Sequence, residues 1–135
     1  MLKEIAKYLN DSGLGFTIGT TLSVGRFESE SPDTCTAIID DMGGEANFFL
    51  PDKKTQKIRF YSRAENINTA RVNIYKVFDF FQGNAQITLP VVTAGEKYIV
   101  NTAHAPSAPF YIYTDEKDLH LYELVVEFDI KNFDT

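Results

Sequence analysis

The sequence predicts an α+β fold, in which a short N-terminal helix and a long central helix pack on a mainly antiparallel or mixed sheet. Helical periodicity occurs in only two segments, whereas the alternation of apolar and polar side chains that is typical of strands dominates elsewhere. The order of one helix, three strands, a long helix and three or four strands differs from the regular alternation of parallel α/β proteins. The 135 residues fit one domain, residues 1–135.

The first dozen residues predict a short amphipathic helix. Apolar side chains recur there at helical spacing with charged residues between them. A glycine then follows, and glycine favours the left-handed conformation in which helices often end. The apolar residues are Leu2, Ile5, Ala6 and Leu9, and the glycine is Gly13.

Three strands are expected before the central helix. Residues 20–27 alternate as a half-buried strand does, and residues 35–41 carry a run of apolar side chains. Residues 57–63 alternate most regularly, which makes them the clearest short strand. A loop over 28–33 and a linker over 42–54 are predicted between them.

The central helix is predicted over residues 67–82. Asn66 is a suitable N-cap, and Gly83 supplies the C-terminal stop. A wide apolar stripe is expected to face the sheet, whereas three further apolar side chains lie off that stripe and are available to a second layer or a partner. The stripe comprises Ile67, Ala70, Ile74, Val77, Phe78 and Phe81, and the residues off it are Val72, Tyr75 and Phe80.

Beyond Gly83 the pattern has the two-residue period of strands. Strands are predicted over residues 85–89, 97–103, 110–114 and 119–130. In the last of these, alternate residues from Tyr122 to Ile130 are apolar, so one face of that strand is expected in the core.

Composition excludes several classes of function. The chain has 13 Lys and Arg against 19 Asp and Glu, for a net charge of -6, which disfavours general binding to nucleic acid or to anionic membranes. A single cysteine, Cys35, cannot form an intramolecular disulfide, and with two histidines it argues against a cysteine-rich zinc site. Without a leader-like segment or a long apolar run, we expect a soluble intracellular domain with no membrane contact.

No pattern in the sequence predicts catalytic residues, a cofactor or a metal site. Asp40 and Asp41 are adjacent on a predicted strand, so their carboxylates point to opposite faces. His104 and His120 are sixteen residues apart and lack the spacing of helical metal ligands. Cys35 is interpreted as a small buried hydrophobic residue.

The charges along the chain fall into two clusters of opposite sign. Residues 53–63 contain five cations and no acid, whereas residues 115–134 contain seven acids and two lysines. Two interpretations remain open: the clusters pair within one chain, or the basic edge of one subunit meets the acidic edge of the next. The residues predicted for such a subunit or partner interface are Lys53, Lys54, Lys57, Arg59, Arg63, Glu123 and Glu127.

The predicted linker 42–54 contains an apolar triplet, Phe48, Phe49 and Leu50. Apolar side chains in a long loop either pack on their own core or remain available until a partner buries them. We therefore include the triplet in the predicted interface.

Several short segments resemble a known family. They are Gly25-Arg26-Phe27, the segment from Pro32 to Ile38, Gly43-Gly44, and the segment from Gln56 to Arg63 that leads into the helix 66–81. Over roughly residues 1–130 the chain resembles the minor capsid protein family of tailed bacteriophages and prophages. The fold of that family is similar to the phage tail terminator and head-to-tail joining proteins.

The resemblance implies a non-enzymatic virion protein without cofactor or metal, assembled in the cytoplasm of the bacterial host. It implies subunits that form a homo-oligomeric ring, which is a hexamer in related proteins, and that bind phage tail-tube or head-connector proteins. DNA is expected at most as passing cargo, because a conduit with many phosphate contacts would retain the genome.

Two other classes of function are weighed against this one. The first is a monomeric small-molecule-binding or small enzymatic α+β domain, with a pocket between the long helix and the sheet that uses Tyr98, Tyr111, Tyr113 and His104. The second is nucleic-acid binding through residues 53–63, which the net charge makes the weakest hypothesis.

Overall fold

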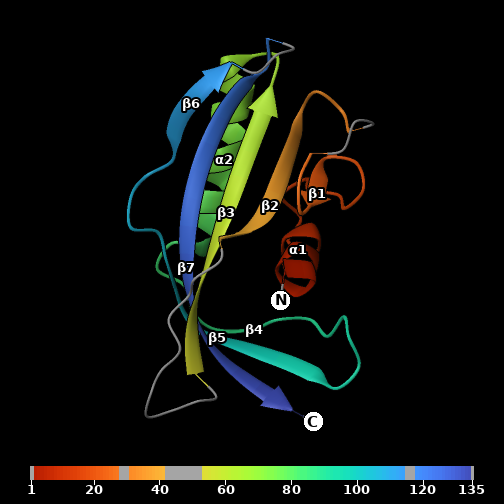
Figure 1. Ribbon diagram of the computed structural model, residues 1–135, viewed down its shortest axis with the longest axis vertical. Helices are drawn as coiled ribbons and strands as arrows, with labels where there is room; N and C mark the ends of the chain where they lie inside the picture. Colours follow the sequence, from red (N-terminus) through yellow and green to blue (C-terminus); the bar gives the residue numbers. More distant parts are fainter. Residues whose placement is uncertain (1, 28–30, 42–52, 115–117, 135) are drawn as a thin grey trace.

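The computed structural model describes residues 2–27, 31–41, 53–114 and 118–134. These residues form two helices packed on a seven-stranded mixed sheet, which confirms the predicted α+β fold (Figure 1). The helices are α1 (Leu2–Asn10) and α2 (Ile67–Phe81). The strands are β1 (Leu22–Val24), β2 (Cys35–Asp41), β3 (Lys53–Ala64), β4 (Ala85–Thr88), β5 (Glu96–His104), β6 (Phe110–Thr114) and β7 (His120–Asp134).

Strand β7 organises the sheet. The strand order is β1-β2-β3-β7-β5-β4, and β6 also pairs with β7. Only β1 and β2 run parallel, and every other described pair is antiparallel. Since β6 pairs with the first residues of β7 and β5 with its last ones, the two strands occupy different stretches of the same edge.

Three predicted strand boundaries are wrong, for local reasons. The strand predicted over 20–27 is shorter because Gly25, at a φ of 102°, turns the chain after Val24. The strand predicted over 57–63 begins at Lys53, because the polar residues at the start of β3 pair with the end of β7. The linker predicted over 42–54 therefore ends too late. Strand β7 continues past Ile130 because its last residues pair with β5.

The predicted ends of α2 are confirmed. The side chain of Asn66 accepts a hydrogen bond from the backbone N–H of Asn68 at 2.8 Å, as an N-cap does. At the other end Gly83 adopts a φ of 76°, the left-handed conformation that ends helices.

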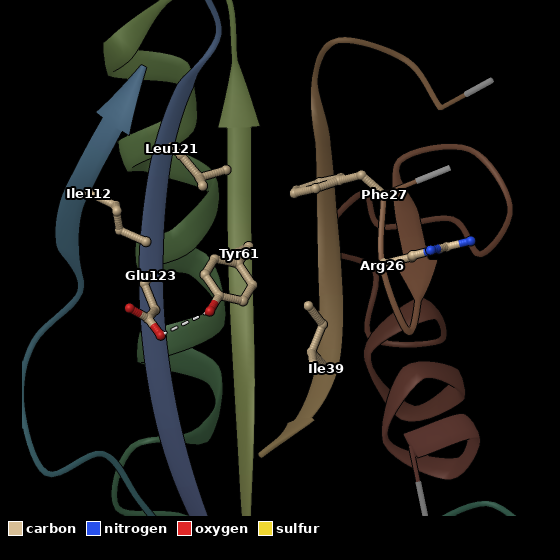
Figure 2. A pocket seen from close by; sticks show the side chains of 7 residues that line it. All are labelled: Arg26, Phe27, Ile39, Tyr61, Ile112, Leu121 and Glu123. Carbon is tan, nitrogen blue, oxygen red and sulfur yellow. Dashed lines mark hydrogen bonds between the residues drawn. The ribbon is translucent and has the colours of Figure 1, made fainter. Parts of the chain in front are cut away.

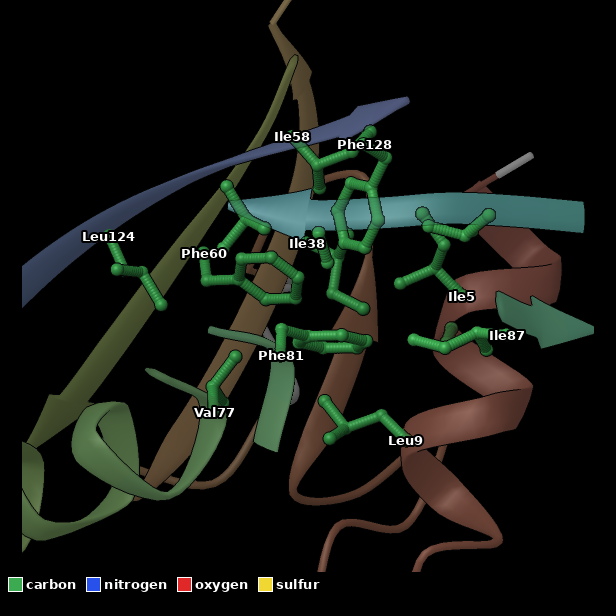
Figure 3. Close-up of a cluster of buried hydrophobic side chains, with 14 of the residues drawn as sticks. Ile5, Leu9, Ile38, Ile58, Phe60, Val77, Phe81, Ile87, Leu124 and Phe128 are labelled. Carbon is green, nitrogen blue, oxygen red and sulfur yellow. The ribbon is translucent and has the colours of Figure 1, made fainter. Parts of the chain in front are cut away.

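The core lies between one face of the sheet and the two helices (Figure 3). Ile58 and Phe60 of β3 and alternate residues of β7 point into it. Phe81 of α2 is fully buried there, with its ring centroid 5.7 Å from that of Phe60 and 5.2 Å from that of Phe128. We call this the inner face of the sheet.

Helix α1 joins the same core and explains one of the side chains off the apolar stripe of α2. The ring of Tyr8 in α1 lies 5.3 Å from the ring of Phe80, so Phe80 faces α1. Val72, by contrast, is 54% exposed on the far side of α2. Because both helices lie on the inner face, no helix of the described residues covers the opposite, outer face of β2, β3 and β7 (Figures 1 and 2).

Candidate interaction site on the outer face of the sheet

A hollow of about 390 Å³ lies on the outer face (Figure 2). Its floor comes from alternate residues of neighbouring strands, since the register places Tyr61 of β3 beside Ala37 of β2 and Glu123 of β7. Apolar side chains form most of its walls. The lining residues are Arg26, Phe27, Ile39, Tyr61, Ile112, Leu121 and Glu123.

Four residues of the predicted interface form ion pairs within the chain, next to this hollow. The antiparallel pairing of β3 and β7 places Lys57 directly opposite Glu127, and their charged groups are 3.8 Å apart. Arg59 donates from a terminal guanidinium nitrogen to Oε1 of Glu123 at 2.9 Å. Of the two interpretations of the charge clusters, the structure thus shows pairing within one chain at these residues, and their contact with another copy stays a prediction.

Glu123 is the charged group at the floor of the hollow and is only 8% exposed. The Tyr61 hydroxyl also donates to its Oε1, at 3.1 Å, so the hydrogen bonds from Arg59 and Tyr61 end on the same oxygen. Burial raises the pKa of the Tyr61 phenol, a hydrogen bond with Arg59 opposes this, and the Glu123 carboxylate raises the pKa further. The phenol therefore keeps its proton at neutral pH and remains a donor.

Arg63, another residue of the predicted interface, is 7% exposed and is held by its own chain. Its guanidinium donates to the backbone carbonyls of Ser31, Pro32 and Asp33 at 3.3, 3.0 and 3.3 Å. It also lies over the ring of Phe27, 4.3 Å from the centroid. Arg63 thus fastens two loop segments to the outer face and leaves little of its surface for a partner.

The remaining predicted interface residues lie at the start of β3 or outside the described residues. Lys53 and Lys54 form the start of β3. Phe48, Phe49 and Leu50 lie outside the described residues, so the interpretation of the apolar triplet stays a prediction.

The residues weighed for catalysis or metal binding do not converge in the part of the chain that the structure covers. No group of three or more His, Cys, Asp or Glu side chains is close enough there to hold a metal ion. His104 is exposed at the end of β5, whereas His120, at the start of β7, shares a hydrogen bond of 3.1 Å with the Tyr111 hydroxyl. Neither α1 nor α2 has the length and apolar character needed to cross a bilayer.

Two of the tyrosines predicted to line a pocket between the long helix and the sheet lie elsewhere. Tyr98 packs in the hydrophobic core, and Tyr111 lies against His120 and Tyr122. A small hollow of about 90 Å³ does lie between α2 and β2, lined among others by Asn73 and Lys76 of α2 and by Cys35 and Thr36 of β2, but neither tyrosine lines it. The larger hollow lies on the outer face.

Most residues of the hollow were not predicted from the sequence as parts of a site. Ile39 carried a usable signal, because it follows Ile38 directly and adjacent strand residues point to opposite faces. A strand with apolar residues on both faces predicts a second surface to be covered. Ile112 and Leu121 carry no such signal, since their place depends on the pairing of β6 with β7.

Cys35 is buried, as expected, on β2 beside Arg63. Burial raises the pKa of its thiol, and the positive charge of Arg63 opposes the increase. At pH 8 we therefore expect a disulfide reagent such as Ellman's reagent to modify folded Cys35 on the order of tenfold or more slower than an exposed cysteine. The variant Ser107→Cys in a Cys35→Ala background supplies that exposed control, and equal rates would contradict the expectation.

Comparisons of the sequence with protein-family models and with curated proteins find no match.

Proposed function

We propose that this protein is a non-enzymatic structural subunit of a tailed bacteriophage or prophage particle. It acts as a minor capsid or tail terminator protein that joins head and tail and assembles as a ring, which is six-fold in the family that its sequence resembles. The resemblance of its sequence motifs to that family supports the proposal. The structural observation that supports it is the hollow on the outer face of the sheet, which is lined mainly by apolar side chains and which no described helix covers.

The chemistry of this surface favours a protein partner. A sheet face that carries apolar side chains is stabilised when another layer packs against it. Large apolar patches on a protein surface mark interaction sites. Two apolar residues of the hollow, Ile39 and Leu121, come from strands whose other face is already buried in the core. A second protein layer would complete the packing of these strands.

The charges of the protein support the proposal that DNA passes through the ring and does not bind to it. Lys57 and Arg59, which the sequence suggested as a basic surface, are neutralised by Glu127 and Glu123. With a net charge of -6, a ring of such subunits would repel phosphates and let the genome pass. The proposed partners are other copies of the chain and tail-tube or head-connector proteins, within a virion assembled in the host cytoplasm.

Light scattering over a range of protein concentrations tests this proposal. We expect a mass several times the 15.3 kDa of one chain, either for the protein alone or after addition of tail-tube protein. A mass that remains at 15.3 kDa under both conditions would contradict the proposed function.

One observation favours a second candidate, a small-molecule-binding domain. The hollow of about 390 Å³ has the size of many ligand pockets, and Glu123 and Tyr61 supply polar groups among apolar walls. A strictly monomeric protein whose melting temperature rises with a small amphipathic amine, and does not rise after Glu123→Gln, would favour this candidate over the ring subunit.

A further inference from the structure

One carboxylate oxygen at the floor of the hollow, Oε2 of Glu123, accepts no hydrogen bond from the described residues of its own chain. Arg59 and Tyr61 both donate to the other oxygen, Oε1. Figure 2 shows that Oε2 points away from Tyr61. A carboxylate in an apolar hollow favours an occupant that carries a cation next to apolar side chains.

The exposed side of α2 carries a cation next to apolar side chains. Ile67 is 40% and Val72 is 54% exposed, and Arg71 lies beside them. At 100° per residue Arg71 and Val72 lie 100° apart with Tyr75 between them, on a side of the helix away from the buried stripe. Ile67 is only 20° from Ile74 and lies at the edge of that stripe. Arg71 lies 5.6 Å from the ring of Tyr75 and forms no ion pair with any described residue.

These two surfaces cannot meet within one subunit. The hollow lies on the outer face of the sheet, whereas α2 covers the inner face and its exposed side points away from the sheet. A contact between them must join two copies head to tail. Contacts of this kind close into a ring when the rotation between copies allows it, and otherwise continue as a filament.

We propose that the exposed face of α2 of one copy packs on the outer face of the sheet of the next copy. Arg71 binds Oε2 of Glu123, and Val72 and Tyr75 cover the apolar walls of the hollow. Complementary charge selects this occupant, and the arginine stem can pass along apolar walls while its head reaches the carboxylate. Each sheet then has helices on both faces, its own and those of its neighbour. This inference rests on the proposed function and names the surfaces that form the ring.

Charge reversal of Arg71 tests the contact. We expect Arg71→Glu to raise the dissociation constant for self-association by about tenfold or more, because it places a second carboxylate against Glu123. Lys3→Glu is the matched control, since it makes the same charge change at an exposed lysine of α1, outside the proposed contact. It should associate like the wild type. Circular dichroism and the melting temperature check that both variants fold.

A disulfide between two copies gives a second, independent readout. In a Cys35→Ala background, Val72→Cys combined with Ile39→Cys should form a ladder of covalent oligomers, and neither cysteine alone should extend beyond a dimer. Wild-type assembly without such a ladder, and without an effect of Arg71→Glu, would overturn this inference and leave the proposed function intact. A wild-type protein that never assembles would overturn both.

Discussion

Phe81→Ala is expected to lower the free energy of unfolding by about 4 kcal/mol. Phe81 is fully buried at the junction of α2, α1 and the sheet, where its ring contacts Phe60, Phe128 and Tyr8. Truncation removes the ring from the core and leaves a cavity that rigid strands cannot close. Because domains are typically stable by about 5–15 kcal/mol, this loss is a large part of the total.

Urea unfolding monitored by circular dichroism measures this effect. Phe110→Ala is the control, because Phe110 is exposed on β6 and its truncation should change stability by less than about 0.5 kcal/mol. Equal midpoints for the two variants would show that the core is not organised around Phe81.

Arg63→Ala is expected to lower the free energy of unfolding by about 3 kcal/mol, the second-largest effect. The substitution leaves the three loop carbonyls without their charged donor and removes the contact with Phe27. Arg63→Lys should lower the free energy of unfolding by less, because the lysine ammonium keeps the positive charge. Some loss remains, because an ammonium cannot reach three carbonyls as the planar guanidinium does.

Arg26→Ala is the matched control for Arg63, because Arg26 is an exposed arginine beside the same hollow. It should change the urea midpoint little. If Arg63→Ala unfolds like Arg26→Ala but self-associates less, Arg63 acts at an interface, as its place among the basic residues of the sequence first suggested.

The features predicted correctly are those encoded by neighbouring residues. Asn66 and Gly83 mark the ends of α2 because capping and left-handed stops depend on a few adjacent residues. The bounds of β2, Cys35–Asp41, follow from a local apolar run and the turn residues around it. The alternation in β3 and β7 identified the side chains that enter the core.

The features that could not be predicted depend on pairing between distant segments. Whether Lys57 meets Glu127 in the same chain or in another copy depends on the partner of β3, and nothing near either residue specifies that partner. The hollow has the same origin, because its residues come from the loop after β1 and from four strands. The sequence therefore shows which charges are available and leaves open where they pair.

We propose that this protein functions through assembly with copies of itself, through surfaces outside its core. Electron micrographs of the purified protein test it most directly. We expect closed rings for the wild type, with six-fold symmetry as the resemblance implies, and their loss in Arg71→Glu. Fields of separate single subunits at every protein concentration, with or without tail-tube protein, would contradict it.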